Sequence, residues 1–398
     1  MIEVIRERGP LTVAAFMDLA LYDPEFGYYA RAPQRSGRAG DFFTSVDVGA
    51  VFGELLEGQL AEMAAILDSR IPPLPCHFDL VEAGAGNGRL SADILRAARR
   101  RDPAFFESIQ LHLVEASPTA RAVHRETLAD VADRLATSGS SLPESFQGVL
   151  FANELLDALA THQVVMRDDG LREVYVDVAH RRRPVRDMRD HQASASGVGA
   201  IGTDDRLTLV EGPLSTPRLA EYLDQLAITL EPGWRVEINL RAIDWIREAS
   251  RRLQRGFMIL IDYGHRAREL YSPSHAAGTL TTFARHQTSG PQSSADAAPW
   301  LQQPGERDIT AHVDFTSVQR AAEDAGLATL GFLDQTYFLL GIVERLGFPG
   351  DPDDLKRRLA VKTLLLPGGL GSTHKVLILG KGVGTPSLVG CSSGGRAT

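Results

Sequence analysis

A run of closely spaced glycines after an apolar stretch is the strongest chemical signal in this sequence. Gly84, Gly86 and Gly88 form the run, and Glu82 stands just before it. Glycines at such a place let the backbone turn sharply and pass close to a bound ligand. The dinucleotide fingerprint requires its third glycine one position later, where this chain has Arg89. The spacing therefore disfavours a pyrophosphate ligand and a nicotinamide-dependent oxidoreductase.

The same spacing suits a ligand that carries an amino acid and a ribose, as S-adenosylmethionine does. Glu82 places a carboxylate beside the turn. Glu115 ends the next apolar stretch, where an acidic side chain accepts hydrogen bonds from the ribose in dinucleotide folds. Taken singly, the two features are also explained by a tight strand-to-helix connection and an exposed carboxylate. Because they occur in the right order, we expect S-adenosylmethionine as the cofactor, bound by Glu82, the three glycines and Glu115.

Asn153, Glu154 and Asp157 form a second polar group at the end of a third apolar stretch. If a helix begins there, Asp157 lies one turn beyond Glu154. Carboxylates in this position can hold a guanidinium through paired, charge-assisted hydrogen bonds. Helix capping by Asn153 and a solvent-exposed Asp157 are the alternative. We interpret Glu154 and Asp157 as candidate catalytic residues and Asn153 as a candidate cofactor ligand.

Asp41, Thr44 and Ser45 lie in a turn-rich segment, residues 22–45, ahead of the first predicted core strand. This segment has the position of a lid, and its three polar side chains are candidate ligands for the amino-acid end of the cofactor. Turn formation and capping of the following helix explain the same residues without a ligand.

His286 and His312 are the candidate general bases if the acceptor is a group that must lose a proton. Both also suit a purely structural role. Each stands alone in the sequence, without a second histidine at metal-ligand spacing, and we therefore expect no metal ion. We choose His286 as the third candidate catalytic residue.

Alternating strands and helices should position these residues. Apolar stretches at 77–82, 109–115, 148–154 and 256–264 predict strands, and helical patterns follow the first two. This alternation predicts an α/β fold with a parallel sheet, in which ligands bind at the carboxyl ends of the strands. The third and fourth strands are separated by about a hundred residues, more than one crossover requires. We expect an insertion there, with a hairpin at Asp168-Asp169-Gly170.

The chain accordingly divides into a core interrupted by one insertion. We expect a helical N-terminal and lid segment at residues 1–70, a Rossmann-like core at 71–160 and 250–385, a substrate-side insertion at 161–249, and a disordered tail at 386–398. The carboxyl ends of the core strands would then face the insertion.

The composition is that of an ordinary globular chain. Of its 398 residues 43% are apolar and 23% charged, which argues against a fibrous or wholly disordered protein. A net charge of -9 without a basic face argues against a nucleic-acid partner. No apolar run suits a membrane span or a signal peptide, and the two cysteines fit a reducing compartment. We expect a cytoplasmic protein without membrane contact, and a homodimer is one option for its assembly.

Several blocks in combination resemble the MidA-like family of bacterial and mitochondrial methyltransferases. The resemblance implies a class I S-adenosylmethionine-dependent methyltransferase sheet with a helical N-terminal segment and a substrate-side insertion. It also implies cofactor contacts from the Asp41 loop, the glycine turn and Glu115, and a substrate pocket near Asn153, Glu154 and residues 308–315. The blocks cover nearly the whole chain and are residues 21–29, 40–45, 52–56, 81–88, 153–159, 261–264 and 304–315.

The resemblance favours a protein arginine guanidinium as the methyl acceptor. Departures from the family pattern gather on the substrate side, for example Val46-Asp47 after Ser45, Ala160, and Phe283 in place of a tyrosine. A peptide or a specialised metabolite, methylated at nitrogen or oxygen, is therefore an alternative acceptor. A non-catalytic assembly protein that has kept the fold is a second alternative, because a fold does not by itself imply an activity.

Overall fold

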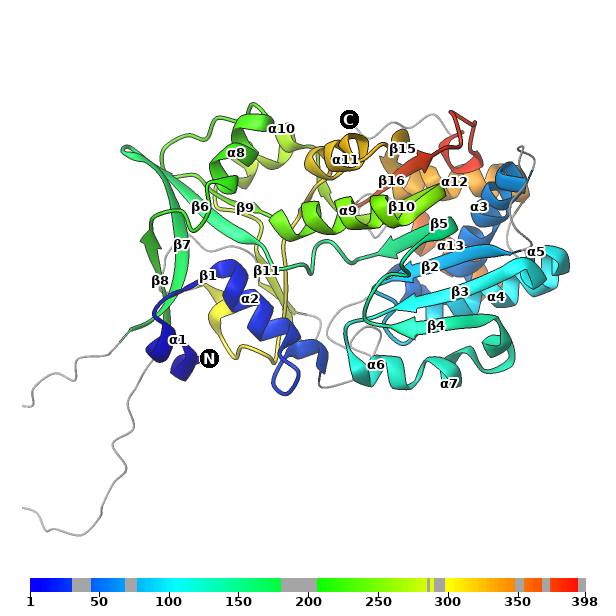
Figure 1. Cartoon of the computed structure of the whole chain (residues 1–398), viewed down its shortest axis with the longest axis horizontal. Helices are drawn as coiled ribbons and strands as arrows, with labels where there is room; N and C mark the ends of the chain where they lie inside the picture. Colours follow the sequence, from blue (N-terminus) through cyan, green and yellow to red (C-terminus); the bar gives the residue numbers. More distant parts are fainter. Residues whose placement is uncertain are drawn as a thin grey trace, which may run out of the picture.

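A sheet with the strand order β15-β16-β10-β5-β2-β3-β4 forms the centre of the molecule, and short β14 pairs with the end of β10 (Figure 1). This computed structural model describes residues 1–30, 44–68, 77–179, 206–284, 287–289, 298–347, 354–366 and 373–392. β16 runs antiparallel to both of its neighbours, while β10, β5, β2, β3 and β4 run parallel to one another. The strands are β2 (Phe78–Ala83), β3 (Ile109–Val114), β4 (Leu135–Gly139), β5 (Phe146–Asn153), β10 (Leu253–His265), β14 (Val313–Asp314), β15 (Ala328–Asp334) and β16 (His374–Lys381).

Helices cover both faces of this sheet. In β10, Phe257 and Ile259 pack toward α3, α4, α12 and α13, whereas Met258 and Leu260 pack toward α8, α9 and α11. Burial on both faces explains why the strand appears in the sequence as a continuous apolar run. The predicted α/β fold is confirmed, and its four predicted strands are β2, β3, β5 and β10. The covering helices are α3 (Val51–Asp68), α4 (Arg89–Arg101), α8 (Arg218–Gln225), α9 (Leu240–Arg252), α11 (Phe315–Asp324), α12 (Gln335–Leu346) and α13 (Leu355–Leu365).

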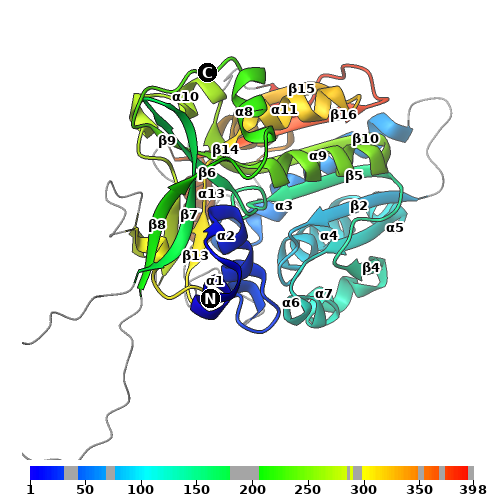
Figure 2. The same ribbon diagram turned by 60° about the vertical axis from the view of Figure 1, so that its left-hand side comes forward.

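A second lobe lies beyond the carboxyl ends of the core strands (Figures 1 and 2). Three segments far apart in the sequence build it, and their shared core joins Phe16, Val176 and Trp300. The first segment is the N-terminal one, with α1 (Ile2–Arg8), β1 (Leu11–Thr12) and α2 (Val13–Tyr22). The insertion contributes β6 (His162–Arg167), β7 (Gly170–Ala179), β8 (Arg206–Gly212) and β9 (Arg235–Ile238). The third segment contains β11 (Thr281–Ala284), β12 (Gln287–Ser289), η6 (Pro299–Leu301) and β13 (Asp308–Thr310).

The structure differs from the predicted domain boundaries at several elements. α3 was expected in the N-terminal segment, and α8 and α9 in the insertion, but all three pack on the core sheet. β11, β12 and β13 were expected in the core but form the small sheet of the second lobe. The expected disorder of 386–398 is wrong for the part that the structure describes, since Leu388 is buried in the core and the Gly390 amide donates to Gln59 Oε1 at 2.8 Å. Long-range packing decides where these elements lie, and local sequence patterns do not indicate such packing.

Local signals explain several helix starts near the site. The Ser117 hydroxyl caps α6 (Pro118–Ala122) by accepting from the Ala120 amide, and Asn239 caps α9 by accepting from the Ala242 amide. Asp314 caps α11 in the same way through the amides of residues 316 and 317. The predicted hairpin is also confirmed, since Arg167 pairs with Gly170 across the two-residue turn between β6 and β7.

Short helices make the remaining connections. The single helix expected after β3 is instead α6 (Pro118–Ala122), α7 (His124–Leu128) and the 3-10 helix η3 (Ala129–Arg134). No helix in the described ranges is both long and apolar enough to cross a membrane. The other short elements are η1 (Tyr28–Ala30), η2 (Ser45–Val48), α5 (Pro103–Ser108), α10 (Ala267–Leu270), η4 (Pro273–His275) and η7 (Val389–Cys391).

Candidate active site

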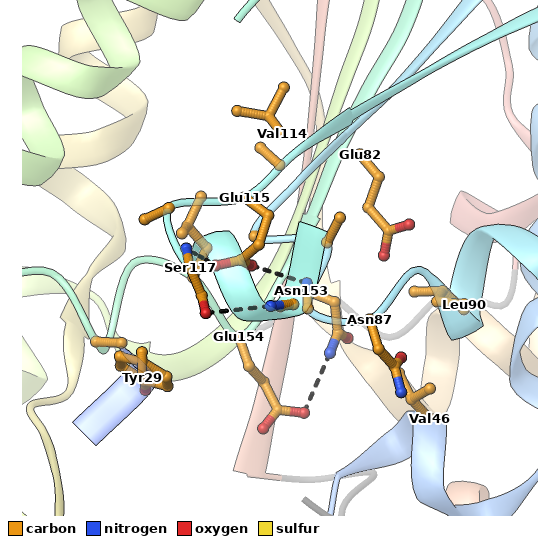
Figure 3. A pocket seen from close by; sticks show the side chains of 18 of the residues that line it. Tyr29, Val46, Glu82, Asn87, Leu90, Val114, Glu115, Ser117, Asn153 and Glu154 are labelled. Carbon is orange, nitrogen blue, oxygen red and sulfur yellow. Dashed lines mark hydrogen bonds between the residues drawn. The ribbon is translucent and has the colours of Figure 1, made fainter. Parts of the chain in front are cut away.

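A cavity of about 340 Å³ lies at the carboxyl ends of β2, β3 and β5 (Figure 3). Its volume is within the range of small-molecule sites. The glycine turn and Glu115 line one side, Asn153 and Glu154 line another, and Trp245 of α9 adds an aromatic wall. The structure thus places the glycine turn with Glu115, and Asn153 with Glu154, around the same cavity.

The glycine turn adopts a backbone that other residues rarely take. Gly84, Gly86 and Gly88 have φ angles of 72°, 52° and 84°, all in the left-handed region. A Cβ on Gly84 would lie 3.1 Å from Leu155 Cδ1, whereas a Cβ on Gly86 would meet nothing within 4 Å. Because Gly86 lines the cavity, a side chain there would project into space that a ligand can use. His124, which the sequence analysis did not single out, holds the turn from behind through Nε2 and the Gly86 carbonyl at 2.8 Å.

Glu115 ties the glycine turn to the start of α6. Its Oε2 accepts from the Gly86 amide at 2.9 Å and its Oε1 accepts from the Ser117 amide at 2.7 Å (Figure 3). Burial raises the pKa of Glu115, and these backbone donors counteract the rise. Each carboxylate oxygen has a further lone pair, so the side chain can still accept from a ribose hydroxyl in the cavity.

Glu82 lies at the inner end of the cavity and is buried among β2 and α4. Its Oε2 accepts from the Ser91 hydroxyl. Burial raises the pKa of Glu82 to about 8, while the hydrogen bonds from Ser91 act in the opposite direction. At neutral pH the carboxyl is therefore mostly protonated in the cofactor-free protein.

This pKa predicts a pH dependence of stability. In the unfolded chain Glu82 loses its proton near pH 4.3, but in the folded chain it keeps the proton until about pH 8. Between those values the folded state binds more protons, so the free energy of unfolding falls with rising pH by up to about 1.4 kcal/mol per pH unit from this group. Glu82→Gln should remove that part of the slope. Denaturant unfolding of the cofactor-free protein at pH 5 to 8 measures it, with exposed Glu144→Gln as the control. Parallel curves for wild type and Glu82→Gln would contradict the assignment.

Glu154 is held in a strained and well-defined position. Its φ is 53°, unusual for a residue other than glycine, and its amide donates to the Ile261 carbonyl at 2.8 Å. The Tyr263 hydroxyl donates to its Oε2 at 3.1 Å and Asn153 Nδ2 donates to its Oε1 at 3.2 Å. His374 Nε2 lies 3.4 Å from Oε1. Three strands of the sheet therefore help to orient one carboxylate at the cavity wall, because Asn153, Tyr263 and His374 stand on β5, β10 and β16.

Further carboxyl groups surround Glu154. Asp262 Oδ2 accepts from the amides of Leu156 and Asp157 at 2.8 Å and 3.3 Å. Burial raises the pKa of Asp262 to about 7 and the pKa of Asp157 well above its usual range, and the charge of Glu154 raises both further. Asp157 Oδ1 is buried with no hydrogen-bond partner in the described ranges. This end of the site therefore holds several buried carboxyl groups whose ionised forms are disfavoured without a cation, and it has an acceptor atom without a partner.

The second lobe reaches the cavity through two tyrosines of the N-terminal segment. Tyr22 donates its hydroxyl to the Ala158 carbonyl at 2.9 Å, and Tyr29 donates to Asp308 Oδ1 at 2.9 Å. Their rings stack with centroids 5.4 Å apart. Both line the cavity, so the N-terminal segment supplies part of its wall.

The other predicted site residues take different places. Thr44 lines the cavity, yet its amide and hydroxyl also donate to Asp47 Oδ2 in a capping arrangement, the alternative considered for it. Ser45 is fully buried and hydrogen-bonds the Gln335 side chain. Asp157 and Gly88 lie behind the cavity wall and do not line it. Asp41 and His286 lie outside the described residues.

Sequence reasoning missed the residues that hold Glu154. Tyr263 directly follows the apolar part of β10, and a polar aromatic residue at a strand end was an available signal for it. His374 begins β16, a strand that was not predicted. The view that His312 stands alone is also wrong, since His265 and His275 lie beside it.

A glycine turn after β2, an acidic residue after β3, and a strand β16 that runs antiparallel to both neighbours are together typical of a class of S-adenosylmethionine-dependent methyltransferases. Residues 55–333 match the model of a family described by that activity and cofactor. The chain belongs to this family and, within it, to the MidA-like methyltransferases. It is a methyltransferase that uses S-adenosylmethionine.

Known methyltransferases are similar to this chain over most of their length. The mitochondrial protein arginine methyltransferase NDUFAF7 of Mus musculus is 32% identical, over 86% of this chain and 73% of its own. The NDUFAF7 homolog of Drosophila melanogaster is 28% identical, over 95% of this chain and 83% of its own. A protein from Burkholderia thailandensis, solved with S-adenosyl-homocysteine bound, has a TM-score of 0.80 at 27% identity, covering all of this chain and 94% of its own.

The groups around the cavity fit S-adenosylmethionine. Asn153 Oδ1 is a buried acceptor with no hydrogen-bond partner in the part of the chain that the structure describes. Glu115 offers acceptors for hydroxyl groups, and the backbone of Gly84 and Gly86 leaves room for close approach. An amino acid, a ribose and an adenine need this mixture of acceptors and apolar wall.

Proposed function

We propose that the chain transfers a methyl group from S-adenosylmethionine to a guanidinium nitrogen of a protein arginine. The observation that carries this proposal is the Glu154 side chain, which lines the cavity, is oriented by Tyr263 and Asn153, and has further buried carboxyls behind it. A cation beside Glu154 would favour the ionised forms of these carboxyls, so the group suits a positively charged acceptor. The printed name of the mouse relative, a protein arginine methyltransferase, supports the same acceptor.

The cofactor side of the proposal uses the glycine turn. We assign Gly84, Gly86 and Glu115 to cofactor binding, with Asn153 at the border between cofactor and acceptor. Bound S-adenosylmethionine supplies an electrophilic methyl group on a sulfonium, and transfer is an in-line displacement. The chain's main contribution is then to align the acceptor nitrogen and keep water out.

The acceptor side uses Glu154. Its carboxylate accepts two charge-assisted hydrogen bonds from the guanidinium, which draws the positive charge toward two nitrogens and leaves the lone pair of the reacting nitrogen more available. Tyr263, Asn153 and His374 stop the carboxylate from rotating away. As the nitrogen–carbon bond forms and the carbon–sulfur bond breaks, the nitrogen loses one proton, which Glu154 accepts.

Labelled methyl transfer tests the acceptor. Purified protein is incubated with methyl-deuterated S-adenosylmethionine and a protein extract from cells that lack this chain, and the hydrolysed proteins are analysed by mass spectrometry. We expect labelled methylarginine, absent when Glu154→Gln replaces the wild type. Label only on another amino acid or on a small metabolite would overturn the arginine proposal in favour of the alternative acceptors. Cofactor binding with no label anywhere would favour a non-catalytic assembly role.

Two finer predictions rest on the sequence alone. The cytoplasmic location follows from the composition and the cysteine content, and the homodimer stays one option for assembly. Light scattering on the purified chain measures its mass in solution and decides between monomer and dimer.

A further inference from the structure

Three histidines from separate segments meet at one point outside the cofactor cavity. His265 ends β10, His275 ends η4, and His312 lies between β13 and β14. One ring nitrogen of each lies within 4.8 Å of those of the other two. The ring centroid of His265 is 5.0 Å from that of His275 and 5.3 Å from that of His312. None of the three lines the cofactor cavity.

Hydrogen bonding leaves nitrogen lone pairs in this cluster. His275 Nδ1 lies 3.1 Å from the Glu269 carbonyl oxygen and 3.2 Å from Ser274 Oγ. Because the carbonyl can only accept, we assign the proton to Nδ1 and the lone pair to Nε2. A histidine that binds a metal through one ring nitrogen usually donates its other N–H to a carbonyl or carboxylate, which fixes the orientation of the ring. His312 Nδ1 is buried with no hydrogen-bond partner in the described ranges.

A carboxylate stands next to the cluster. Glu269 Oε1 lies 3.0 Å from His265 Nδ1, although His265 Nδ1 makes no well-directed hydrogen bond there. Burial lowers the pKa of His265, and Lys375 also lowers it whereas Glu269 raises it. Burial together with the neighbouring His265 and His275 lowers the pKa of His312 to about 4. These shifts favour the neutral forms of His265 and His312, and neutral imidazole is the form that binds a metal.

We propose that His265, His275 and His312 bind a divalent transition metal, with Zn²⁺ as the preferred ion and Glu269 or a water as the fourth ligand. Imidazole nitrogen is a preferred ligand of zinc, and three histidines with one further ligand form a usual tetrahedral set. Zinc bonds of about 2.0 Å place tetrahedral ligand nitrogens about 3.3 Å apart, so small rotations of these side chains complete the site. The methyl transfer itself does not use this metal.

The site has a structural consequence. His265 belongs to the strand that carries Tyr263, and His312 follows β13, whose Asp308 contacts Tyr29 of the cavity wall. A bound ion would join the end of β10 to η4 and to the segment between β13 and β14. The metal would thus fix the core against the second lobe on the acceptor side.

Metal titration of the full, tag-free protein tests the site. After treatment with a chelator and dialysis, Zn²⁺ is added in competition with a chromophoric chelator, and bound zinc is counted by mass spectrometry of the metal. We expect one ion per chain, an affinity at least about 100-fold weaker in His275→Ala, and a smaller loss in Glu269→Gln. His77→Ala is the matched control, because His77 precedes the amino end of β2 whereas His265 is at the carboxyl end of the parallel strand β10, and it should bind as the wild type does.

The alternative is a packed cluster of three neutral rings. Absence of zinc binding, or equal affinity in wild type and His275→Ala, would establish that cluster and overturn the proposal. Binding of S-adenosylmethionine and the far-ultraviolet circular dichroism of His275→Ala show whether the variant is folded. If His275→Ala is misfolded, Glu269→Gln and His265→Gln decide by the same titration. The readout needs no methyl acceptor, so its outcome is independent of the proposed function.

Discussion

Glu154→Gln is expected to lower kcat by about 10²- to 10⁴-fold while leaving the Kd for S-adenosylmethionine within about twofold of the wild type. Glutamine keeps the size but lacks the charge that attracts a guanidinium, and its single amide oxygen can accept from Tyr263 or from Asn153 but not from both. The left-handed φ of 53° strains either residue to a similar extent, so the change should not reorganise the backbone. Steady-state kinetics with the acceptor that the labelling experiment identifies gives kcat, and calorimetric titration with S-adenosylmethionine gives the Kd.

Two further variants make this result specific. Glu144→Gln removes a carboxylate from an exposed loop and should change neither quantity. Tyr263→Phe removes only the hydroxyl that donates to Glu154 Oε2 and should lower kcat by less than Glu154→Gln does. Unchanged turnover in Glu154→Gln would remove Glu154 from the mechanism, and an equal loss of cofactor binding would make it a cofactor ligand instead.

Gly86→Arg is expected to weaken S-adenosylmethionine binding by at least about 100-fold, or about 2.7 kcal/mol. A Cβ at this position meets no atom within 4 Å, so the arginine side chain would extend into the cavity and occupy the place of the cofactor. The φ of 52° also strains any residue other than glycine. Calorimetry with S-adenosylmethionine and S-adenosylhomocysteine measures the loss, and NAD serves as the ligand that should not bind either protein.

Gly326→Arg is the matched control for this change. Gly326 has a φ of 88°, and a Cβ there also meets nothing within 4 Å, but it lies between α11 and β15 and does not line the cavity. Both variants place a side chain on a backbone with a left-handed φ and are strained in the same way, whereas only Gly86→Arg fills the site. If the two variants lose cofactor affinity equally, the loss comes from strain and the cavity is not where the cofactor binds.

The part of the candidate site around the glycine turn could be predicted from the sequence because each element of it is local. Gly84, Gly86 and Gly88 are within one turn, and their left-handed angles are the reason that glycine is needed there. Glu82 and Glu115 belong to the strand ends on either side of that turn. Two consecutive strand-helix units place such residues at one edge of a sheet, so apolar periodicity and glycine spacing were enough.

The acceptor side could not be predicted in the same way. Glu154 is oriented by Tyr263 and His374, which stand on β10 and β16 and become its neighbours only through the strand order of the sheet. Asp157 was expected near the reacting atoms, but burial beside Asp262 places it behind the cavity wall. No local pattern encodes these contacts, because they depend on which strands lie side by side.

The second lobe and the histidine cluster also depend on tertiary packing and not on local sequence. The sequence by itself determined the α/β class, the glycine turn, the hairpin between β6 and β7, and the membership of the family, since hydrophobic period, turn residues and motif order are properties of neighbouring residues. Only the tertiary structure decided that three distant segments share one core and that His265, His275 and His312 meet. Such meetings follow from the packing of whole elements against each other, which buries apolar surface regardless of distance along the chain.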